Sequence, residues 1–444
     1  MSEVPRSGLK FVAYLRKIRK AAPLSIPMTL DMQHLFSIVA GRLRASEIRE
    51  LLKLLDRPEM ISFAGGLPNP AAFPVAAMQE IVAHVMRDHA PEALQYGPTE
   101  GHFRLRSAIA RGMGEHYGAA QDVDNILITT GSQQALSLLC TVLLDPDDVV
   151  LTASPTYLGA LLTFNACRAR VQGVATDSEG LVPEALEEQL RALQNDNRRA
   201  KFVYLVPTFD NPTGRTMGIE RRQRVYDLAC EYDILVIEDD PYGLLRFEGQ
   251  PVAPIKSLDK EGRVAYLGSF SKILAPGFRV GWLAAEPTLM RKAVLAKQAQ
   301  DICTSVFGQY CVFESMIHDM LFKHIETICA LYRRKRDLML KAISDEFPPI
   351  VQWNRPSGGL FLWLELPAAI DATELLPKAI NNAVAYVTGK PFFPDGTGHN
   401  TLRLNFSYAE DAHIIEGIKR LANVIKEEMA RVSAGTGADH IPIF

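Results

Sequence analysis

Lys272 lies in the segment SFSKILAPGFRVGW, residues 269–282, which follows a strand-like apolar run. Ser269 and Ser271 precede the lysine, and Arg279 follows it closely. A lysine amine forms Schiff bases with carbonyl compounds, whereas hydroxyl groups and an arginine fork suit a phosphate. In most proteins, however, a lysine after a strand is an ordinary surface residue, and an arginine there lies along the surface or pairs with an acid.

Polar side chains also follow three other apolar runs. Ser132 and Gln133 open a helix after NILITT, and Asn211 lies in TFDNPTG after KFVYLVP. Asp239 and Tyr242 lie in DDPYG after DILVIE. Because ligands of open α/β sheets bind beyond the carboxyl ends of the strands, we expect these groups to meet at one site.

Each of these features also has a simpler structural explanation. Ser132 alone is more often a helix N-cap, Asn-Pro-x-Gly alone is a turn, and adjacent aspartates cap helices or face solvent. Together, the groups match the needs of pyridoxal phosphate. That cofactor requires a lysine amine, an acid that keeps the pyridine nitrogen protonated, and donors for its ring hydroxylate and its phosphate.

Short apolar runs alternate with amphipathic segments along most of the chain, which favours a mostly parallel sheet covered by helices on both faces. The predicted strands are 125–130, 148–153, 201–207, 233–239, 263–269 and 279–285, and the predicted helices between them are 132–144, 157–166, 182–194 and 218–231. A smaller α+β unit is predicted by long helical stretches over 287–345, the segment GGLFLWLELP, a helix near 371–382, the strand candidates AVAYV and TLRLNFS, and a final helix at about 410–430. We expect an N-terminal segment at 1–60, a large domain at 61–310 and a small C-terminal domain at 311–444.

The chain resembles the fold type I pyridoxal-phosphate enzymes, specifically the class I and II aminotransferases, over about residues 45–430. SFSKILAPGFRVGW resembles their Schiff-base signature. FAGGLPNPAAFP (63–74) and YGPTEGHFRLRSAIA (96–110) resemble the kynurenine/2-aminoadipate branch. The resemblance implies that an L-amino acid of 2-aminoadipate, kynurenine, aromatic or long aliphatic type gives its amino group to 2-oxoglutarate by a ping-pong mechanism.

Two alternatives remain at this point. One is a different reaction on the same fold, such as elimination, decarboxylation or racemisation, because a fold does not determine a reaction. The other is a transcription regulator with an aminotransferase-like domain, for which residues 1–60 are too short and too irregular to form a convincing winged helix and linker.

The resemblance assigns roles around the cofactor ring. Lys272 would form the internal aldimine and move the proton between the substrate α-carbon and the cofactor. Asp239 would pair with the pyridinium nitrogen, and Asn211 and Tyr242 would donate to the ring hydroxylate. Tyr157, in SPTY, would stack on the ring.

The resemblance also assigns the phosphate site. Its donors would be Ser132, Gln133, Ser269, Ser271 and Arg279. Tyr96 would reach the phosphate of the neighbouring subunit, which implies a homodimer with shared active sites.

The substrate site is implied in the same way. Arg403, in TLRLNFS, would bind the substrate α-carboxylate with Asn211, and Gly66 would let the backbone approach it closely. Arg49 would belong to an N-terminal segment that covers the site and meets a distal acidic group. Phe361, in GGLFLWLEL, would favour aromatic or long aliphatic substrates.

Composition restricts the partners. The 48 Lys and Arg against 51 Asp and Glu give a net charge of −3, so no global field favours nucleic acid or a membrane. Six scattered cysteines without a C-x-x-C pair indicate a reducing compartment and predict a cytoplasmic protein. The ten histidines form no recognisable ligand motif, so the sequence predicts no metal site.

The N-terminal segment VPRSGLKFVAYLRKIRKAA carries six basic residues and no acid. A solvated helix has this pattern, and so does a transit peptide or a membrane-surface helix. No apolar run reaches membrane-spanning length.

Overall fold

The computed structural model describes residues 32–42 and 59–435, which belong to two separate units, Met1–Arg42 and Leu43–Phe444. The described part of the first unit contains two single-turn 3-10 helices, Gln33–Leu35 and Ala40–Arg42. The basic N-terminal segment and Arg49 lie outside the described residues. Among the helices that are described, none is both long and apolar enough to cross a membrane.

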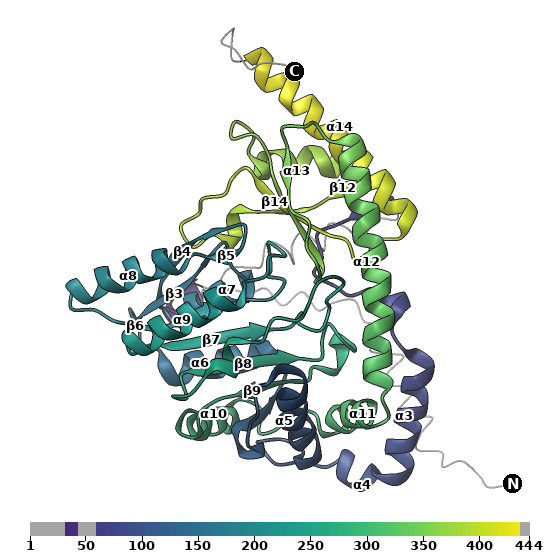
Figure 1. The fold of residues 1–444 in the computed structure, drawn as a ribbon. Helices are drawn as coiled ribbons and strands as arrows, with labels where there is room; N and C mark the ends of the chain where they lie inside the picture. Colours follow the sequence, from purple (N-terminus) through teal and green to yellow (C-terminus); the bar gives the residue numbers. More distant parts are fainter. Residues whose placement is uncertain (1–31, 43–58, 436–444) are drawn as a thin grey trace, which may run out of the picture. The chain divides into compact units, whose positions relative to one another are not determined.

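An eight-stranded sheet forms the centre of the second unit (Figure 1). Its strands, in spatial order, are β2 (Ile126–Thr129), β9 (Gly281–Ala284), β8 (Val264–Ser269), β7 (Leu235–Asp240), β6 (Ala200–Leu205), β3 (Val149–Ser154), β4 (Arg170–Asp177) and β5 (Gly180–Leu181). Neighbours from β8 to β4 run parallel, and β9 runs antiparallel to β2 and β8. The predicted mostly parallel sheet is confirmed.

Helices cover both faces of this sheet, as predicted. Strand β6 shows why, because alternate side chains of one strand point to opposite faces. Phe202 and Tyr204 pack in the core that contains α6 (Ser132–Leu143) and α7 (Leu158–Ala166). Val203 and Leu205 pack in the other core, with α8 (Pro183–Asn195) and α9 (Ile219–Glu231).

Strand β4 is the longest of the described strands that the sequence pattern did not predict. It lies between β3 and the two-residue strand β5, near one edge of the sheet. Only Val174 of its eight residues is buried, and the other seven are half-buried or exposed. A strand that buries so little apolar surface lacks the continuous hydrophobic run that marks the central strands.

A second, antiparallel sheet follows later in the chain. Its order is β10 (Gln352–Trp353), β11 (Phe361–Glu365), β14 (Thr401–Asn405) and β13 (Val387–Thr388). Helices α13 (Ala372–Asn381) and α14 (Asp411–Gly435) share a core with it. A short strand from much earlier in the chain also lies in this region, because β1 (Ile61–Ser62) pairs with β12 (Val384–Ala385).

The remaining helices join these parts of the second unit. They are α3 (Val75–Asp88), α4 (Ala90–Ala93), α5 (Phe103–Tyr117), α10 (Pro287–Gln300), α11 (Val306–Ile317) and α12 (Met320–Glu346), with 3-10 turns at Pro70–Ala72, Val123–Asn125, Ile255–Leu258, Pro276–Phe278 and Lys390–Phe392. Helix α12 packs against both α11 and α14 (Figure 1). The predicted domain boundary after residue 310 falls inside α11, and the division at 61–310 and 311–444 stays a prediction.

Candidate active site

The carboxyl ends of β2, β6, β7 and β8 point to the same edge of the large sheet. Ser132 follows β2, Asn211 follows β6, Asp239 lies at the end of β7, and Lys272 follows β8. Arg403 comes from β14 of the second sheet. Arg403 donates a hydrogen bond to Asn211, so groups from both sheets meet here.

The amine of Lys272 lies in a protected, positively charged environment. Its Nζ donates a hydrogen bond to the carbonyl oxygen of Gly66 at 2.7 Å. Burial, together with the nearby charges of Arg403 and Arg279, lowers the pKa of Lys272 to about 8. A large fraction of this amine is therefore neutral near pH 8, and the neutral form is the nucleophile and the base.

Asp239 is a buried carboxylate with one oxygen still available. Oδ2 accepts a hydrogen bond from the hydroxyl of Tyr204 at 2.8 Å. Oδ1 is buried and has no hydrogen-bond partner among the described residues. Burial raises the pKa of Asp239 to about 7, even though the Tyr204 hydrogen bond opposes that rise. This carboxylate therefore lacks a cationic or N–H partner, and a protonated ring nitrogen would supply one.

Arg403 is a buried cation, 2 % exposed. Its guanidinium donates to Oδ1 of Asn211 at 2.7 Å and to the carbonyl oxygen of Ala64 at 2.8 Å. It also lies 4.2 Å from the ring centre of Phe361 and 5.3 Å from that of Phe392. Within the described ranges no carboxylate pairs with it, and burial lowers the pKa of Arg403 to about 10.

An anion would therefore stabilise Arg403. Its Nε is buried without a hydrogen-bond partner in the described part of the chain. A planar guanidinium with an unused donor suits a carboxylate, which offers two oxygens in the same plane.

The start of α6 has the geometry of a phosphate site. Gly131 is the helix N-cap with φ 76°, and a Cβ there would lie 2.6 Å from a terminal nitrogen of Arg279. The Arg279 guanidinium also donates to the carbonyl oxygen of Thr130 at 3.3 Å. Ser132 is the first helical residue, so its simpler explanation as an N-cap is wrong. Free N–H groups at a helix N-terminus beside an arginine favour an anion.

The other predicted residues near this edge have defined contacts. The Tyr157 hydroxyl donates to Oε1 of Gln133 at 3.3 Å, and Gln133 donates in turn to Thr163 at 2.8 Å. Tyr242 is buried, and its ring meets Phe361 edge-on with 5.8 Å between the centroids. Burial is the main cause that raises the pKa of Tyr242, which keeps its phenol protonated and able to donate.

The serines before Lys272 and the glycine beside it also have defined places. Ser269 Oγ accepts from the backbone N–H of Ser271 at 3.1 Å, which fixes the turn. A Cβ at Gly66 would lie 3.4 Å from Phe361, which is an ordinary contact. Gly66 therefore contributes to the site through its carbonyl oxygen, which accepts the hydrogen bond from Lys272.

Two predicted residues are not part of this group. Tyr96 is 78 % exposed on the single chain, and Arg49 lies outside the described residues. The structure also adds residues that the sequence analysis missed, chiefly Tyr204 behind Asp239 and Phe392 beside Arg403. A tyrosine in a strand that is mostly buried was the available signal for Tyr204, because a buried phenol needs a polar partner.

Comparisons with known proteins agree with this geometry. The model of the family "Aminotransferase class I and II" matches residues 61–421. The aromatic-amino-acid aminotransferase 1 of Thermococcus litoralis is 48% identical over 403 residues, which cover 91% of this chain and 97% of the relative.

Two solved structures are similar over the same region. A Pyrococcus horikoshii kynurenine aminotransferase in complex with PMP has a TM-score of 0.87 and 48% identity, covering 90% of this chain and 98% of that one. The α-aminoadipate aminotransferase LysN of Thermus thermophilus, complexed with N-(5'-phosphopyridoxyl)-L-leucine, has a TM-score of 0.83 and 39% identity, covering 90% and 100%.

The chain therefore belongs to the class I and II aminotransferases, with the fold type I architecture. It is a transaminase, and its cofactor is pyridoxal 5'-phosphate. The site fits that cofactor on structural grounds. The buried Oδ1 of Asp239 lacks a partner among the residues described, the Lys272 amine has a lowered pKa, and Arg279 lies beside the start of α6.

Proposed function

We propose that this aminotransferase exchanges amino groups between 2-oxoglutarate and an L-amino acid with an aromatic, long aliphatic or 2-aminoadipate-like side chain. The names of its relatives support these donors, since they include aromatic amino acids, kynurenine and α-aminoadipate. The leucine adduct bound to LysN adds an aliphatic side chain. The ring of Phe361 beside Arg403 offers such side chains an apolar contact.

The observation that carries the proposal is the buried guanidinium of Arg403, which has no carboxylate partner among the described residues. Both the amino acid and the oxo acid present an α-carboxylate, and Arg403 would bind each in turn. Its contacts with Asn211 and Ala64 fix the plane of the guanidinium before substrate arrives. Because one site serves both substrates, they must react in sequence, as in a ping-pong mechanism.

The same geometry supports the roles of the other residues around the ring. Bound pyridoxal phosphate supplies an electron sink for the substrate α-carbon and stores the amino group between the two half-reactions. Lys272 would hold the cofactor covalently and, once released, move the proton at the substrate α-carbon. Asp239 would keep the ring nitrogen protonated, with Tyr204 orienting the carboxylate. Asn211 and Tyr242 would donate to the ring hydroxylate.

The remaining cofactor contacts follow the same proposal. Tyr157 would lie against the ring face. The phosphate would be held at the start of α6 and at the turn after β8 by Ser132, Gln133, Ser269, Ser271 and Arg279. Gly66 and Arg49 would contribute to the substrate side of the site.

We further propose a homodimer that works in the cytoplasm. Tyr96 is 78 % exposed beside Leu94 at 67 % and near Phe103 at 60 %. Exposed aromatic and aliphatic side chains in one stretch are typical of an interface, and Tyr96 would reach the phosphate of the partner subunit. The described cysteines are all free, which agrees with a reducing compartment.

A half-reaction tests the reaction type. Holoenzyme mixed with one donor and no oxo acid should form one equivalent of 2-oxo acid per site and then stop until 2-oxoglutarate is added. Continuous product formation without an oxo acid would contradict the proposal and favour a lyase or a decarboxylase. A panel of aromatic, aliphatic and acidic donors with 2-oxoglutarate would then rank the substrates.

A further inference from the structure

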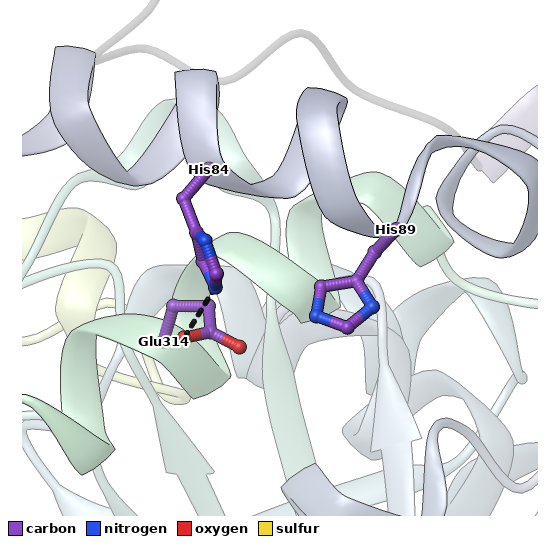
Figure 2. Close-up of side chains that lie close together, drawn as sticks. All are labelled: His84, His89 and Glu314. Atoms are coloured by element: carbon purple, nitrogen blue, oxygen red, sulfur yellow. Dashed lines mark ion pairs between the residues drawn. The ribbon is translucent and has the colours of Figure 1, made fainter.

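A second group of chemically capable side chains lies between α3 and α11, apart from the residues of the proposed active site. His84 is near the end of α3, His89 is the residue that ends this helix, and Glu314 lies on α11. One ligand atom from each of the three lies within 4.8 Å of those of the other two. Figure 2 shows both imidazole rings directed from the end of α3 toward the Glu314 carboxylate.

Glu314 is a buried carboxylate without a lysine or arginine partner in the described part of the chain. Its side chain is 4 % exposed, and its ion-pair contacts are His84 Nε2 at 3.5 Å and His318 Nε2 at 3.2 Å. A buried carboxylate costs free energy unless a cation or several donors compensate it. Neutral imidazoles compensate it only where they present an N–H.

His84 Nδ1 lies between a carboxylate and a guanidinium. It is 2.7 Å from Asp88 Oδ2, which only accepts, and 3.2 Å from a terminal nitrogen of Arg87, which only donates. Arg87 also donates to Asp88 through Nε at 3.1 Å. With the proton on Nδ1, which the shorter contact favours, a neutral ring presents the Nε2 lone pair to the Glu314 carboxylate. Two acceptors facing each other require a cation between them, such as a metal ion.

We propose that His84, His89 and Glu314 form a zinc site. Zn²⁺ binds imidazole nitrogens and carboxylate oxygens at about 2.0–2.2 Å in a tetrahedron, so its ligand atoms stand roughly 3.3–3.5 Å apart. The 3.5 Å between His84 Nε2 and Glu314 Oε2 already matches this separation. His89, whose ring stacks on Tyr310 with 5.2 Å between centroids, has a ring nitrogen within 4.8 Å of the other two ligand atoms and would complete the set, with water in the fourth position.

The Asp88 contact favours a metal in a second way. Histidines that bind metals usually donate their other ring N–H to a carboxylate, which fixes the tautomer and makes the ring a stronger ligand. The 2.7 Å contact with Asp88 gives His84 this arrangement when the proton is on Nδ1. The sequence shows no motif here because the two histidines have an unusual spacing and Glu314 lies far along the chain.

The test is a zinc titration of metal-stripped holoenzyme in competition with a chromophoric chelator. We expect one zinc per chain and a higher thermal midpoint. His84→Ala and Glu314→Gln should each weaken zinc binding at least tenfold. Asp88→Asn should weaken it by no more than the ligand variants do, roughly tenfold, because it removes only the partner of a ligand.

His413→Ala is the matched control, since this histidine is exposed on α14 and outside the cluster. It should bind zinc like the unchanged protein. Circular dichroism and the transamination rate without zinc should be unchanged in every variant, which separates lost binding from lost folding. Zinc binding, the thermal midpoint and circular dichroism do not depend on which amino acid is the donor.

Two results would overturn the proposal. One is the absence of zinc binding, which would leave the Glu314 carboxylate with its histidine contacts alone. The other is unchanged binding in His84→Ala that disappears when thiols are alkylated, which would place the zinc on cysteines such as Cys140 and Cys167.

Discussion

The reactivity of Lys272 depends on its surroundings more than on its own chemistry. A free lysine amine is almost fully protonated at neutral pH, but burial and the charges of Arg403 and Arg279 lower the pKa here to about 8. The carbonyl of Gly66 holds the amine in place. The Lys272 amine is thus partly deprotonated near pH 8, and its hydrogen bond to Gly66 fixes its direction.

We predict that Lys272→Ala abolishes turnover and the absorbance of covalently held cofactor. No other lysine among the described residues takes the place of Lys272. The variant therefore loses both the covalent attachment of the cofactor and the proton carrier, so the rate should fall by at least a thousandfold. Lys292→Ala, at an exposed position on α10, is the control and should keep full activity. Activity retained by Lys272→Ala would refute the assignment.

Arg403 offers a second prediction at the scale of one side chain. Arg403→Lys keeps a positive charge but loses the planar fork, and Arg403→Ala loses both. We expect kcat/KM for the amino acid and for the oxo acid to fall together, by about 3 kcal/mol or a hundredfold for alanine. A fall for only one of the two substrates, measured by steady-state kinetics, would show that Arg403 does not bind the shared α-carboxylate.

Asp239 makes a prediction about pH. Its pKa is raised from 3.8 to about 7 in the folded apoenzyme, so between these values the folded chain holds a proton that the unfolded chain has lost. The free energy of unfolding contributed by this group therefore falls as pH rises from about 4 to 7, by on the order of 4 kcal/mol.

Asp239→Asn is the test of that prediction, because asparagine has the same shape and does not titrate. Urea unfolding of the two apoenzymes should give similar stabilities near pH 4, and the variant should be the more stable above pH 7. With pyridoxal phosphate the order should reverse, since the variant cannot pair with a ring N–H⁺. Parallel pH profiles for the two apoenzymes would disprove the raised pKa.

At the scale of elements, the end of α10 holds the loop between β2 and α6. Asp301 accepts from Thr130 at 2.9 Å, from Gln134 at 2.8 Å and from Lys297 at 2.7 Å. Thr130 in turn accepts the Arg279 hydrogen bond through its carbonyl oxygen. The loop between β2 and α6, where the phosphate would bind, is therefore held in place by α10, which makes none of the proposed phosphate contacts.

We predict that Asp301→Ala lowers the free energy of unfolding by about 3 kcal/mol and weakens cofactor binding. It leaves Lys297, which is 0 % exposed, as a buried cation without its carboxylate. Asp345→Ala is the control, because Lys341 and Asp345 have the same four-residue spacing on an exposed helix face. That change should cost less than about 0.5 kcal/mol. Equal losses in the two variants, measured in urea, would contradict the prediction.

Burial explains which elements the sequence could predict. Strands β6 and β7 are largely buried on both faces, and their predicted positions agree with the structure to within two residues. Strand β4, next to the short edge strand β5, buries too little to be recognised. The role of Tyr204 was also hidden, because an aromatic residue in a strand suggests packing, and its partner Asp239 lies on another strand. Such contacts depend on the sheet order, which local patterns do not encode.

At the scale of the whole molecule, the proposed dimer would complete the active site. The residues around Lys272 come from one chain, whereas Tyr96 is exposed and outside that group. If Tyr96 serves the partner's phosphate, each active site draws on two chains. A monomer would then keep the fold and lose much of its cofactor affinity.

Hybrid dimers test this arrangement directly. Lys272→Ala disables the site on its own chain, whereas Tyr96→Ala should disable the site on the partner. Unfolding and refolding the two inactive variants together should produce hybrids in which one site has both residues, so activity should return to about a quarter of that of the unchanged enzyme. Each variant refolded alone is the control. If mixing restores no activity while sedimentation shows that hybrids have formed, Tyr96 acts within its own chain or not at all.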